Sequence, residues 1–300
     1  MLKIAWNDHY TIPLPVGHRF PMVKYDLIPE QLLYEGTIKE ANIFSPGQLS
    51  EYDIFTIHDK SYWEKLKEGK LSKDEIRRTG FPYSKQLVVR ERVILQGTID
   101  CANYAKEYGV AMNVAGGTHH AFKDRGEGFC LLNDIAVSAQ YLLDSNFSEQ
   151  ILVVDLDVHQ GNGTANIFEN EPCVYTFSMH GGKNYPLKKE TSDLDIPLPD
   201  GIDDKSYLSL LKFHLPKLLD DLEPDFIFYQ SGVDVLGTDK LGRLGLSMHG
   251  CKERDRFVLE ICKKNNIPVA VSMGGGYSEK IADIVEAHAN TFRMASEIYF

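Results

Sequence analysis

Two aspartates and a histidine follow an apolar run at intervals of two residues. In "ILVVDLDVHQGNG", residues 151–163, four apolar residues precede Asp155, Asp157 and His159, and a Gly-Asn-Gly turn comes next. If a strand continues through this segment, its period of two places all three side chains on one side. Three buried polar groups without partners are costly in free energy. The spacing therefore predicts that these side chains bind a metal ion.

Polar side chains also follow the other apolar runs of the chain. His119 and His120 follow 109–114, Ser178 and His180 end 173–180, Asp234 follows 225–232, and Tyr277 follows 267–273 on a glycine-rich turn. Taken singly, each has an ordinary structural explanation, such as a chance pair of histidines, a helix N-cap or a tight turn. If the runs are neighbouring parallel strands, their carboxyl ends meet at one edge of the sheet, where ligands bind.

The residue types at this edge fit metal-assisted hydrolysis of an amide. Asp157, His159 and Asp234 would supply one nitrogen and two carboxylate ligands. This set suits Zn²⁺ or Fe²⁺ and leaves positions open for water and substrate. The two adjacent histidines would act beside the metal as acid and base. The phenol of Tyr277 would donate a hydrogen bond to a developing oxyanion.

Apolar runs of strand length alternate with amphipathic helical patterns along the chain. The strand-like runs are 109–114, 150–157, 173–179, 225–232 and 267–273, and the helical patterns are 84–108, 131–145, 204–221, 250–265 and 278–298. This alternation predicts one α/β domain over residues 1–300, with a parallel sheet covered by helices on both faces. We expect Pro216 to kink or break the 204–221 helix. Residues 1–83, rich in proline and turn residues, are expected to form loops over the site.

The composition indicates a folded, intracellular protein. Of the 300 residues, 43% are hydrophobic and 25% are charged, as in ordinary globular proteins. The net charge of -11 and the lack of a Lys/Arg-rich run count against a nucleic-acid partner. Five scattered cysteines without a C-x-x-C pair predict reduced thiols and no Cys-ligated zinc. The N-terminus does not resemble a secretory signal and no apolar run reaches ~20 residues, so we expect a cytoplasmic protein without membrane contact.

Four longer motifs resemble, in order, the signature blocks of the histone deacetylase family. They are "GGTHHAFKDRGEGFCLLNDIAV", "VVDLDVHQGNGT", "SGVDVLGTDKLGRLGLS" and "MGGGYS", and the resemblance is strong over about residues 110–280. The family includes bacterial acetoin-utilisation and deacetylase-like proteins, and the Gln-Gly-Asn after "DLDVH" is similar to its class IV branch. The resemblance implies an arginase/deacetylase-type fold, with helices around a parallel sheet of about eight strands. It also implies a zinc-dependent deacylase that hydrolyses acetyl-lysine or longer acyl-lysine side chains with a metal-activated water.

The resemblance also implies a role for each matching residue. Asp157, His159 and Asp234 correspond to the zinc ligands, His120 to the general base and acid, His119 to its electrostatic helper, and Tyr277 to the phenol that polarises the acyl carbonyl. Asp155 corresponds to the carboxylate that bonds the first histidine, and Asn162 stands at the position of the second histidine's partner. Asp155 and Ser178, with backbone carbonyls of Asp157, His159 and Met179, would bind a structural K⁺ or Na⁺. The acyl-lysine tunnel would be lined by Gly128, Phe129, Tyr185, Leu241, Gly275 and Gly276.

Two positions depart from the usual pattern of the family. Many members have Asp where Asn162 stands, so the base of this chain has a neutral partner. Tyr185 occupies a wall position that is often Phe, which changes the polarity of the tunnel.

Three other functions remain open from the sequence. A deacylase of acylpolyamines or other small amides would use the same residues. An arginase-like ureohydrolase with two Mn²⁺ ions would need a second carboxylate cluster, whereas Val235 and Leu236 follow Asp234. A non-catalytic module that binds acylated lysine would not need the His120 base and the Tyr277 phenol, and this chain has both.

Overall fold

A sheet of eight strands forms the centre of the protein, and all neighbouring strands are parallel. The computed structural model describes residues 1–300. The strand order is β2-β1-β3-β8-β7-β4-β5-β6. The strands are β1 Lys3–Ala5, β2 Ile43–Phe44, β3 Val110–Asn113, β4 Ile151–Asp155, β5 Val174–Gly181, β6 Leu194–Leu198, β7 Phe226–Gln230 and β8 Val269–Ser272. The predicted α/β fold with a central parallel sheet is confirmed.

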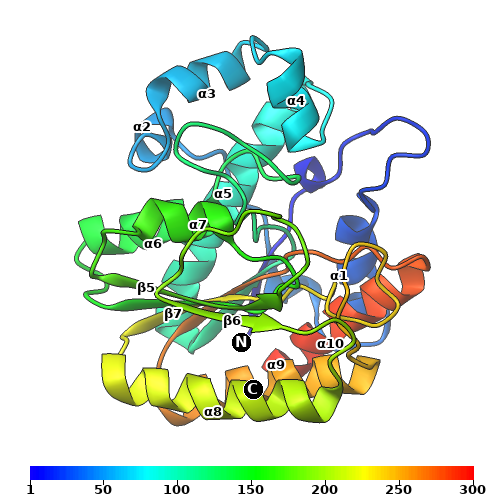
Figure 1. Ribbon diagram of the computed structural model, residues 1–300, viewed down its shortest axis with the longest axis vertical. Coiled ribbons are helices and arrows are strands. Elements are labelled where there is room, and N and C mark those ends of the chain that lie inside the picture. The colour runs from blue at the N-terminus through cyan, green and yellow to red at the C-terminus, as the bar shows by residue number, and fades with distance from the viewer.

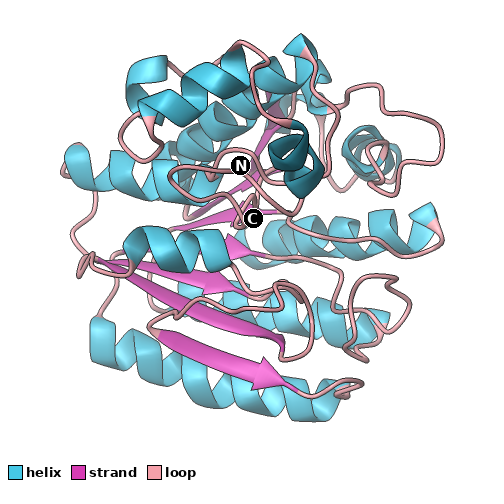
Figure 2. Ribbon diagram, turned by 45° about the horizontal axis from the view of Figure 1, so that its top comes forward, coloured by secondary structure: helices cyan, strands magenta, loops and turns pink.

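Helices cover both faces of this sheet (Figure 1). On one face lie α5 Lys85–Tyr108, α6 Asp134–Asp144 and α7 Asn162–Phe168, and on the other lie α8 Asp204–Leu222, α9 Met248–Lys264 and α10 Ile281–Tyr299. The N-terminal helices are α1 Lys24–Tyr34, which packs on α10, and α2 Glu51–Ile54, α3 Lys60–Lys67 and α4 Lys73–Thr79, which lie beyond α5. Figure 2 shows the strands crossing the molecule between the two helical layers. No helix is long and apolar enough to span a membrane.

The central strands are apolar along most of their length because helices cover them on both sides. All residues of β3, β4, β7 and β8 are buried, as is typical of strands inside a parallel sheet. Helix α5 begins after Ser84, whose side chain accepts a hydrogen bond from the Leu87 amide, and it ends at Gly109 with a φ of 86°. These caps define the α5–β3 connection that leads into the motif "GGTHH".

Two expectations about local structure are wrong, and a third is wrong in part. Residues 1–83 contain two strands and four α-helices, because their apolar side chains, including the fully buried Trp63, pack into the main core. Helix α8 continues through Pro216 from Asp204 to Leu222, so the expected break does not occur, and the alternative of a kink stays a prediction. Strand β4 ends at Asp155, so Asp157 and His159 lie on the following loop and do not share a strand face with it.

Candidate active site

The strand order brings the polar ends of five strands together. Strands β3, β8, β7, β4 and β5 are consecutive neighbours in the sheet, although they are far apart along the chain. The segments at their carboxyl ends carry the histidine pair, Tyr277, Asp234, the Asp157–His159 segment and His180, respectively. The side chains that sequence spacing singled out are thus collected at the carboxyl edge of one sheet, where open parallel sheets bind ligands.

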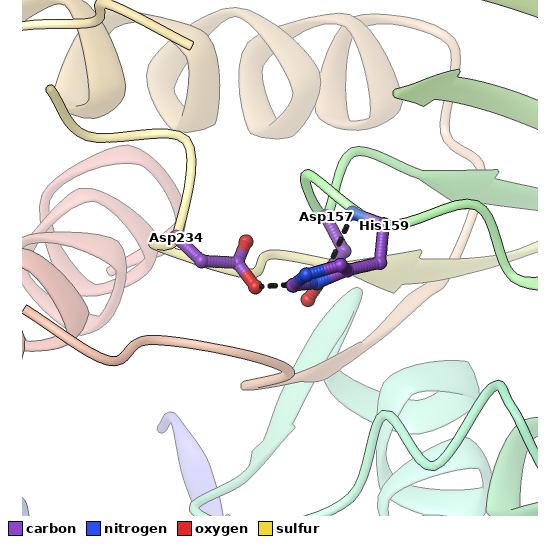
Figure 3. A group of neighbouring side chains, drawn as sticks. All are labelled: Asp157, His159 and Asp234. Carbon is purple, nitrogen blue, oxygen red and sulfur yellow. Dashed lines mark hydrogen bonds and ion pairs between the residues drawn. The ribbon is translucent and has the colours of Figure 1, made fainter. Parts of the chain in front are cut away.

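Asp157, His159 and Asp234 form a compact triad at this edge (Figure 3). One ligand-type atom from each lies within 4.8 Å of the other two, and the residues are only 1%, 8% and 0% exposed. His159 Nδ1 lies 3.1 Å from a carboxylate oxygen of Asp157 and 3.1 Å from one of Asp234. No other group of His, Cys, Asp and Glu in the 300 residues meets the same geometric description.

Backbone amides orient the two carboxylates of the triad. Asp157 accepts hydrogen bonds from the His159 amide at 3.0 Å and the Gly275 amide at 2.7 Å, and Asp234 accepts one from Val158 at 2.9 Å. A side chain at Gly275 would collide with both carboxylates, which explains a glycine there. The carboxylates also face His159, so the three side chains are pre-organised as a set of ligands for a metal ion.

The electrostatics of the triad fit a bound cation. Burial and the neighbouring Asp157 carboxylate raise the pKa of Asp234 above its usual range. Burial lowers the pKa of His159, but hydrogen bonds to Asp157 and Asp234 outweigh it and raise this pKa to about 10. Two buried carboxylates therefore compete for one positive partner. One imidazole nitrogen and two carboxylates are a donor set that suits Zn²⁺ or Fe²⁺.

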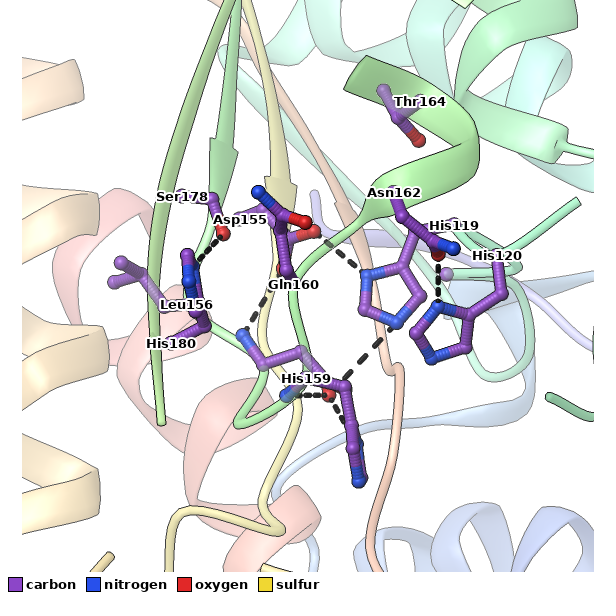
Figure 4. A network of polar contacts seen from close by, with 12 residues as sticks. His119, His120, Asp155, Leu156, His159, Gln160, Asn162, Thr164, Ser178 and His180 are labelled. Atoms are coloured by element: carbon purple, nitrogen blue, oxygen red, sulfur yellow. Dashed lines mark hydrogen bonds and ion pairs between the residues drawn. The ribbon is translucent and has the colours of Figure 1, made fainter. Parts of the chain in front are cut away.

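His119 and His120 are paired with different partners (Figure 4). His119 Nδ1 lies 2.7 Å from the Asp155 carboxylate, and His120 Nδ1 lies 2.7 Å from the amide oxygen of Asn162. The two ring centroids are 4.1 Å apart, and both residues are buried. Because an amide oxygen only accepts hydrogen bonds, Nδ1 of His120 carries the proton and Nε2 is left as the base.

The two imidazoles differ in pKa because one is bonded to a carboxylate and the other to a neutral amide. Burial opposes a charge on His119, but the carboxylates of Asp155 and Asp157 outweigh it and raise the pKa of His119. Burial, with His119 and His159 nearby, holds the pKa of His120 well below its usual range, and the bond to Asn162 only partly offsets this. His120 is therefore the neutral base of the pair.

Tyr277 reaches the site from the loop after β8. Its ring centroid lies 6.4 Å from that of His159, and its amide donates to Asp239 at 2.6 Å. Burial and the charges of Asp234 and Asp157 raise the pKa of Tyr277 well above its usual range. The phenol therefore stays protonated and can donate a hydrogen bond beside the triad.

A pocket of about 240 Å³ opens onto these groups. Its lining consists of Arg19, Arg78, His120, Gly128, Phe129, His159, Tyr185, Leu241 and Tyr277. Four of the six residues expected in the tunnel wall are in this set. Gly275 lines a smaller adjoining space behind the pocket. Gly276 lines neither, because it packs against Val233, Ile284 and His288 in the core.

The wall of the pocket is aromatic, and backbone hydrogen bonds to α4 fix the segment that carries it. Gly128 and Phe129 both have positive φ, at 59° and 65°, and their amides donate to the Arg78 and Thr79 carbonyls of α4. The Phe129 ring lies 5.9 Å from the Tyr277 ring. Tyr185 stands edge-on to the His120 ring at 5.0 Å and donates its hydroxyl to Glu127 at 2.6 Å. The hydroxyl of Tyr185 is thus bonded to Glu127, and its ring forms part of the pocket wall.

The residues expected at a monovalent cation site lie next to one another. Asp155 of β4 pairs in register with Ser178 of β5, and Met179 follows. The hydroxyl of Ser178 lies 3.0 Å from His180 Nδ1. The K⁺ or Na⁺ site itself stays a prediction.

Sequence spacing did not identify the residues whose hydrogen bonds fix the loops around the histidine pair. Asp134, at the start of α6, accepts hydrogen bonds from the Gly117 and Thr118 amides at 3.1 and 2.8 Å, which shapes the loop before the histidine pair. His58 bonds Phe122 O with Nδ1 and the Asn133 amide with Nε2, both at 2.9 Å. Asp134 lies in the "LLND" part of the first motif, whereas no local pattern distinguishes His58.

Two buried cations behind the triad were also missed. Lys24 is fully buried and donates to the Gly274 carbonyl at 3.0 Å, with its nitrogen 5.9 Å from the Tyr277 ring centroid. Arg254 donates to the carbonyls of Leu156 and Gly232, at 3.1 and 2.6 Å, and so ties the loops after β4 and β7 together. Both lie in amphipathic helices, where a charged residue is normally expected on the exposed face.

Comparisons with known proteins agree with this geometry. The histone deacetylase domain family matches residues 18–292. An uncharacterized protein of Picosynechococcus sp. is 42% identical over 99% of both chains. Type-1 histone deacetylase 1 of Dictyostelium discoideum is 34% identical over 91% of this chain and 58% of its own, and histone deacetylase 2 of Arabidopsis thaliana is 27% identical over 95% and 76%.

Solved structures show the same fold. The crystal structure of an HDAC homolog complexed with SAHA covers 99% of this chain and 84% of its own with a TM-score of 0.85 and 23% identity. The crystal structure of an HDAC homolog from Aquifex aeolicus has the same coverage and identity, with a TM-score of 0.84. With a family match over most of its length, and with its motifs gathered at one sheet edge, the chain belongs to the histone deacetylase family of amide hydrolases.

Proposed function

We propose that this protein removes acyl groups from the side-chain nitrogen of lysine, and that one divalent ion, Zn²⁺ or Fe²⁺, is held by Asp157, His159 and Asp234. One observation carries the proposal: His159 of the triad, His120 and Tyr277 line one pocket, and Asp157 lines the smaller space that adjoins it. When bound, the ion would polarise the amide carbonyl and acidify water.

The proton transfers belong to His120. Asn162 holds its Nδ1 proton, so Nε2 is free to take a proton from the attacking water. As the carbon–nitrogen bond breaks, the same nitrogen returns that proton to the departing lysine amine. His119, bonded to Asp155, places a second imidazole 4.1 Å away and helps keep His120 neutral before attack.

Tyr277 stabilises the charge that develops on the carbonyl oxygen. Its protonated phenol would donate a hydrogen bond to that oxygen in the transition state. The walls formed by Phe129, Tyr185 and Leu241 fit the aliphatic stem of the lysine and exclude water. A free lysine ammonium would lose its hydration in such a pocket, which favours release of the product.

Reconstitution with metal tests the proposal directly. After chelation and dialysis, the protein should hydrolyse a capped, fluorogenic acetyl-lysine amide only when a divalent ion is returned, and one equivalent should give full activity. Asp234→Asn should abolish both metal binding and turnover. Asp220 is exposed on α8, and Asp220→Asn should alter neither. Hydroxamates with an aliphatic chain should inhibit turnover, because the hydroxamate chelates the metal while the chain fills the pocket.

Other outcomes would point to the alternatives. Two tightly bound equivalents would favour the arginase-like reaction, for which the chain has only one such cluster. Tight binding of acyl-lysine without turnover would indicate a binding module. A much higher kcat/KM for acylpolyamines than for acyl-lysine peptides would make the small-amide deacylase the better assignment.

We further propose a K⁺ or Na⁺ site around Asp155 and Ser178 and a cytoplasmic location. The first is supported by the neighbouring positions of these residues on β4 and β5. The second is supported by five free cysteines, four of them buried. Turnover measured with K⁺, Na⁺ or a bulky organic cation as the counterion tests the first, and cell fractionation tests the second.

A further inference from the structure

The mouth of the pocket carries positive charge in a protein that is otherwise acidic. Arg19 and Arg78 line the pocket together with the buried His120 and His159, and both arginines are exposed. Arg19 also lines a neighbouring hollow that contains the exposed Lys240. The net charge of the chain is -11, so this group of three cations, the mouth cations, is a local exception.

None of the mouth cations forms a close ion pair with a carboxylate of the protein. No ion pair within 4 Å includes any of them, whereas Arg77, next to Arg78 on α4, pairs with Asp74 at 3.1 Å. Of the nearby carboxylates, Glu127 accepts the Tyr185 hydroxyl and lies 3.7 Å from Arg125. Glu279 lines the neighbouring hollow and forms no ion pair within 4 Å. Among the residues that line the pocket and the hollow, the three mouth cations thus outnumber the one carboxylate, Glu279.

Both arginines are attached to the wall of the pocket, Arg19 through its side chain and Arg78 through its backbone. The Arg19 guanidinium carbon lies 5.1 Å from the centroid of the Phe129 ring, and the Arg78 carbonyl accepts the Gly128 amide at 3.0 Å. His18, beside Arg19, bonds the Gly80 carbonyl at 2.9 Å, which links the Arg19 loop to the end of α4. The two residues thus belong to linked segments of one pocket wall.

We propose that the mouth cations select acylated lysines that have Asp or Glu beside them in the peptide, and disfavour cationic substrates. The inference rests on the proposed deacylase function, because it assumes that an acyl-lysine side chain enters this pocket. With the acyl group at the buried triad, the peptide backbone and flanking side chains lie at the mouth, where the arginines are. An acylpolyamine would bring further ammonium groups to the same place and would be repelled.

Three substrates and a set of variants test this inference. The substrates are a capped acetyl-lysine amide, the same lysine flanked by two Asp residues, and the same lysine flanked by two Lys residues. In low salt the kcat/KM should rank Asp-flanked above unflanked above Lys-flanked, by roughly two- to fivefold for each charge pair formed. The differences should shrink at about 0.5 M salt, because these groups are exposed.

The variants show whether the mouth cations cause the ranking. Arg19→Gln and Arg78→Gln should each reduce the ratio of kcat/KM for the Asp-flanked peptide to that for the Lys-flanked peptide, mainly through KM. Because this ratio is taken within each variant, a change in the rate of all three substrates alike does not enter it. Arg77→Gln is the matched control, since it removes an arginine from the same helix that already has a partner. Arg78→Glu should shift the preference toward the Lys-flanked peptide.

The outcomes separate this inference from the function on which it rests. If the metal-loaded wild type did not hydrolyse the unflanked acetyl-lysine amide, the deacylase proposal itself would be refuted. Normal turnover of all three substrates with equal kcat/KM, or a ranking that Arg77→Gln changes as much as Arg78→Gln does, would overturn the inference alone.

Discussion

Replacing Asn162 by Asp would test how the base of this site is tuned. The chain contains its own reference: His119 and His120 are adjacent and buried, and each has Nδ1 2.7 Å from a side-chain oxygen. The oxygen belongs to a carboxylate for His119 and to an amide for His120. The pKa of the first imidazole is raised by that carboxylate and the pKa of the second is held low by burial. Asn162→Asp makes the second pair resemble the first.

The size of the effect follows from this distance. A carboxylate within hydrogen-bond reach of an imidazole raises its pKa by about 1–3, and a change of one in pKa corresponds to about 1.4 kcal/mol. His120 must be neutral to accept a proton, so the acidic limb of kcat/KM should move to higher pH by about one or more. At a pH below both limbs, the variant should be slower than the wild type by about tenfold for each pH unit that separates the two limbs.

The assay is the pH profile of kcat/KM with an unflanked acetyl-lysine amide and saturating metal. Bound metal is measured at each pH, because loss of metal would also lower the rate. Asn162→Ala is the control, since it removes the acceptor of the Nδ1 proton without adding charge, and it should lower the rate without moving the limb upward. An acidic limb that stays in place or moves down in Asn162→Asp would show that His120 is not the group that sets it.

Three further changes probe the phenol, the wall and the support behind the histidines. Tyr277→Phe should lower kcat for acetyl-lysine by ~10² or more with little change in KM, because the lost hydrogen bond forms chiefly in the transition state, and an unchanged kcat would remove Tyr277 from the mechanism. Phe129→Ala should raise KM and retain metal, although its ring also packs on Phe20 at 5.2 Å, so a lower Tm is expected as well; loss of metal would make Phe129 a structural residue only. Burial lowers the pKa of His58 from 6.5 to about 4, so between these values the unfolded chain binds a proton that the folded chain excludes, and stability falls as the pH drops. Urea unfolding of His58→Gln should therefore show a weaker loss in this window than the wild type, by up to about 1.4 kcal/mol per pH unit, and parallel curves would contradict the buried neutral state.

The sequence was sufficient to predict five of the eight strands and the residues that follow them, because both depend on local patterns, whereas no apolar run marked β1, β2 or β6. Apolar runs of strand length mark β3, β4, β5, β7 and β8, and in a parallel sheet the carboxyl ends of neighbouring strands must meet. The shared strand face predicted for Asp155, Asp157 and His159 was nevertheless wrong. These residues meet because the loop after β4 folds back, with the Asp157 amide donating to Asp155 and the His159 amide to Asp157.

The residues that were missed act over long sequence distances. Lys24 reaches Gly274 across 250 positions, and His58 reaches Asn133 across 75. Nothing within a short window around either residue records such a partner. A break at Pro216 does not occur for a related reason, since the packing of α8 on α9 favours a continuous helix more strongly than one missing amide hydrogen bond opposes it.

The residues that we propose for catalysis and for substrate choice come from separate parts of this chain. His120, Asn162, the triad and Tyr277 lie in segments after the central strands, whereas Arg19 and Arg78 come from residues 1–83, where the sequence predicts only loops. Because Asn162 and Arg78 share no hydrogen-bond partner, their effects should be independent. In the double variant Asn162→Asp/Arg78→Gln, the pH limb should shift as in the first single variant and the Asp-to-Lys preference should fall as in the second. A preference that changed with the state of His120 would show that the flanking charges act on the chemical step and not on binding at the mouth.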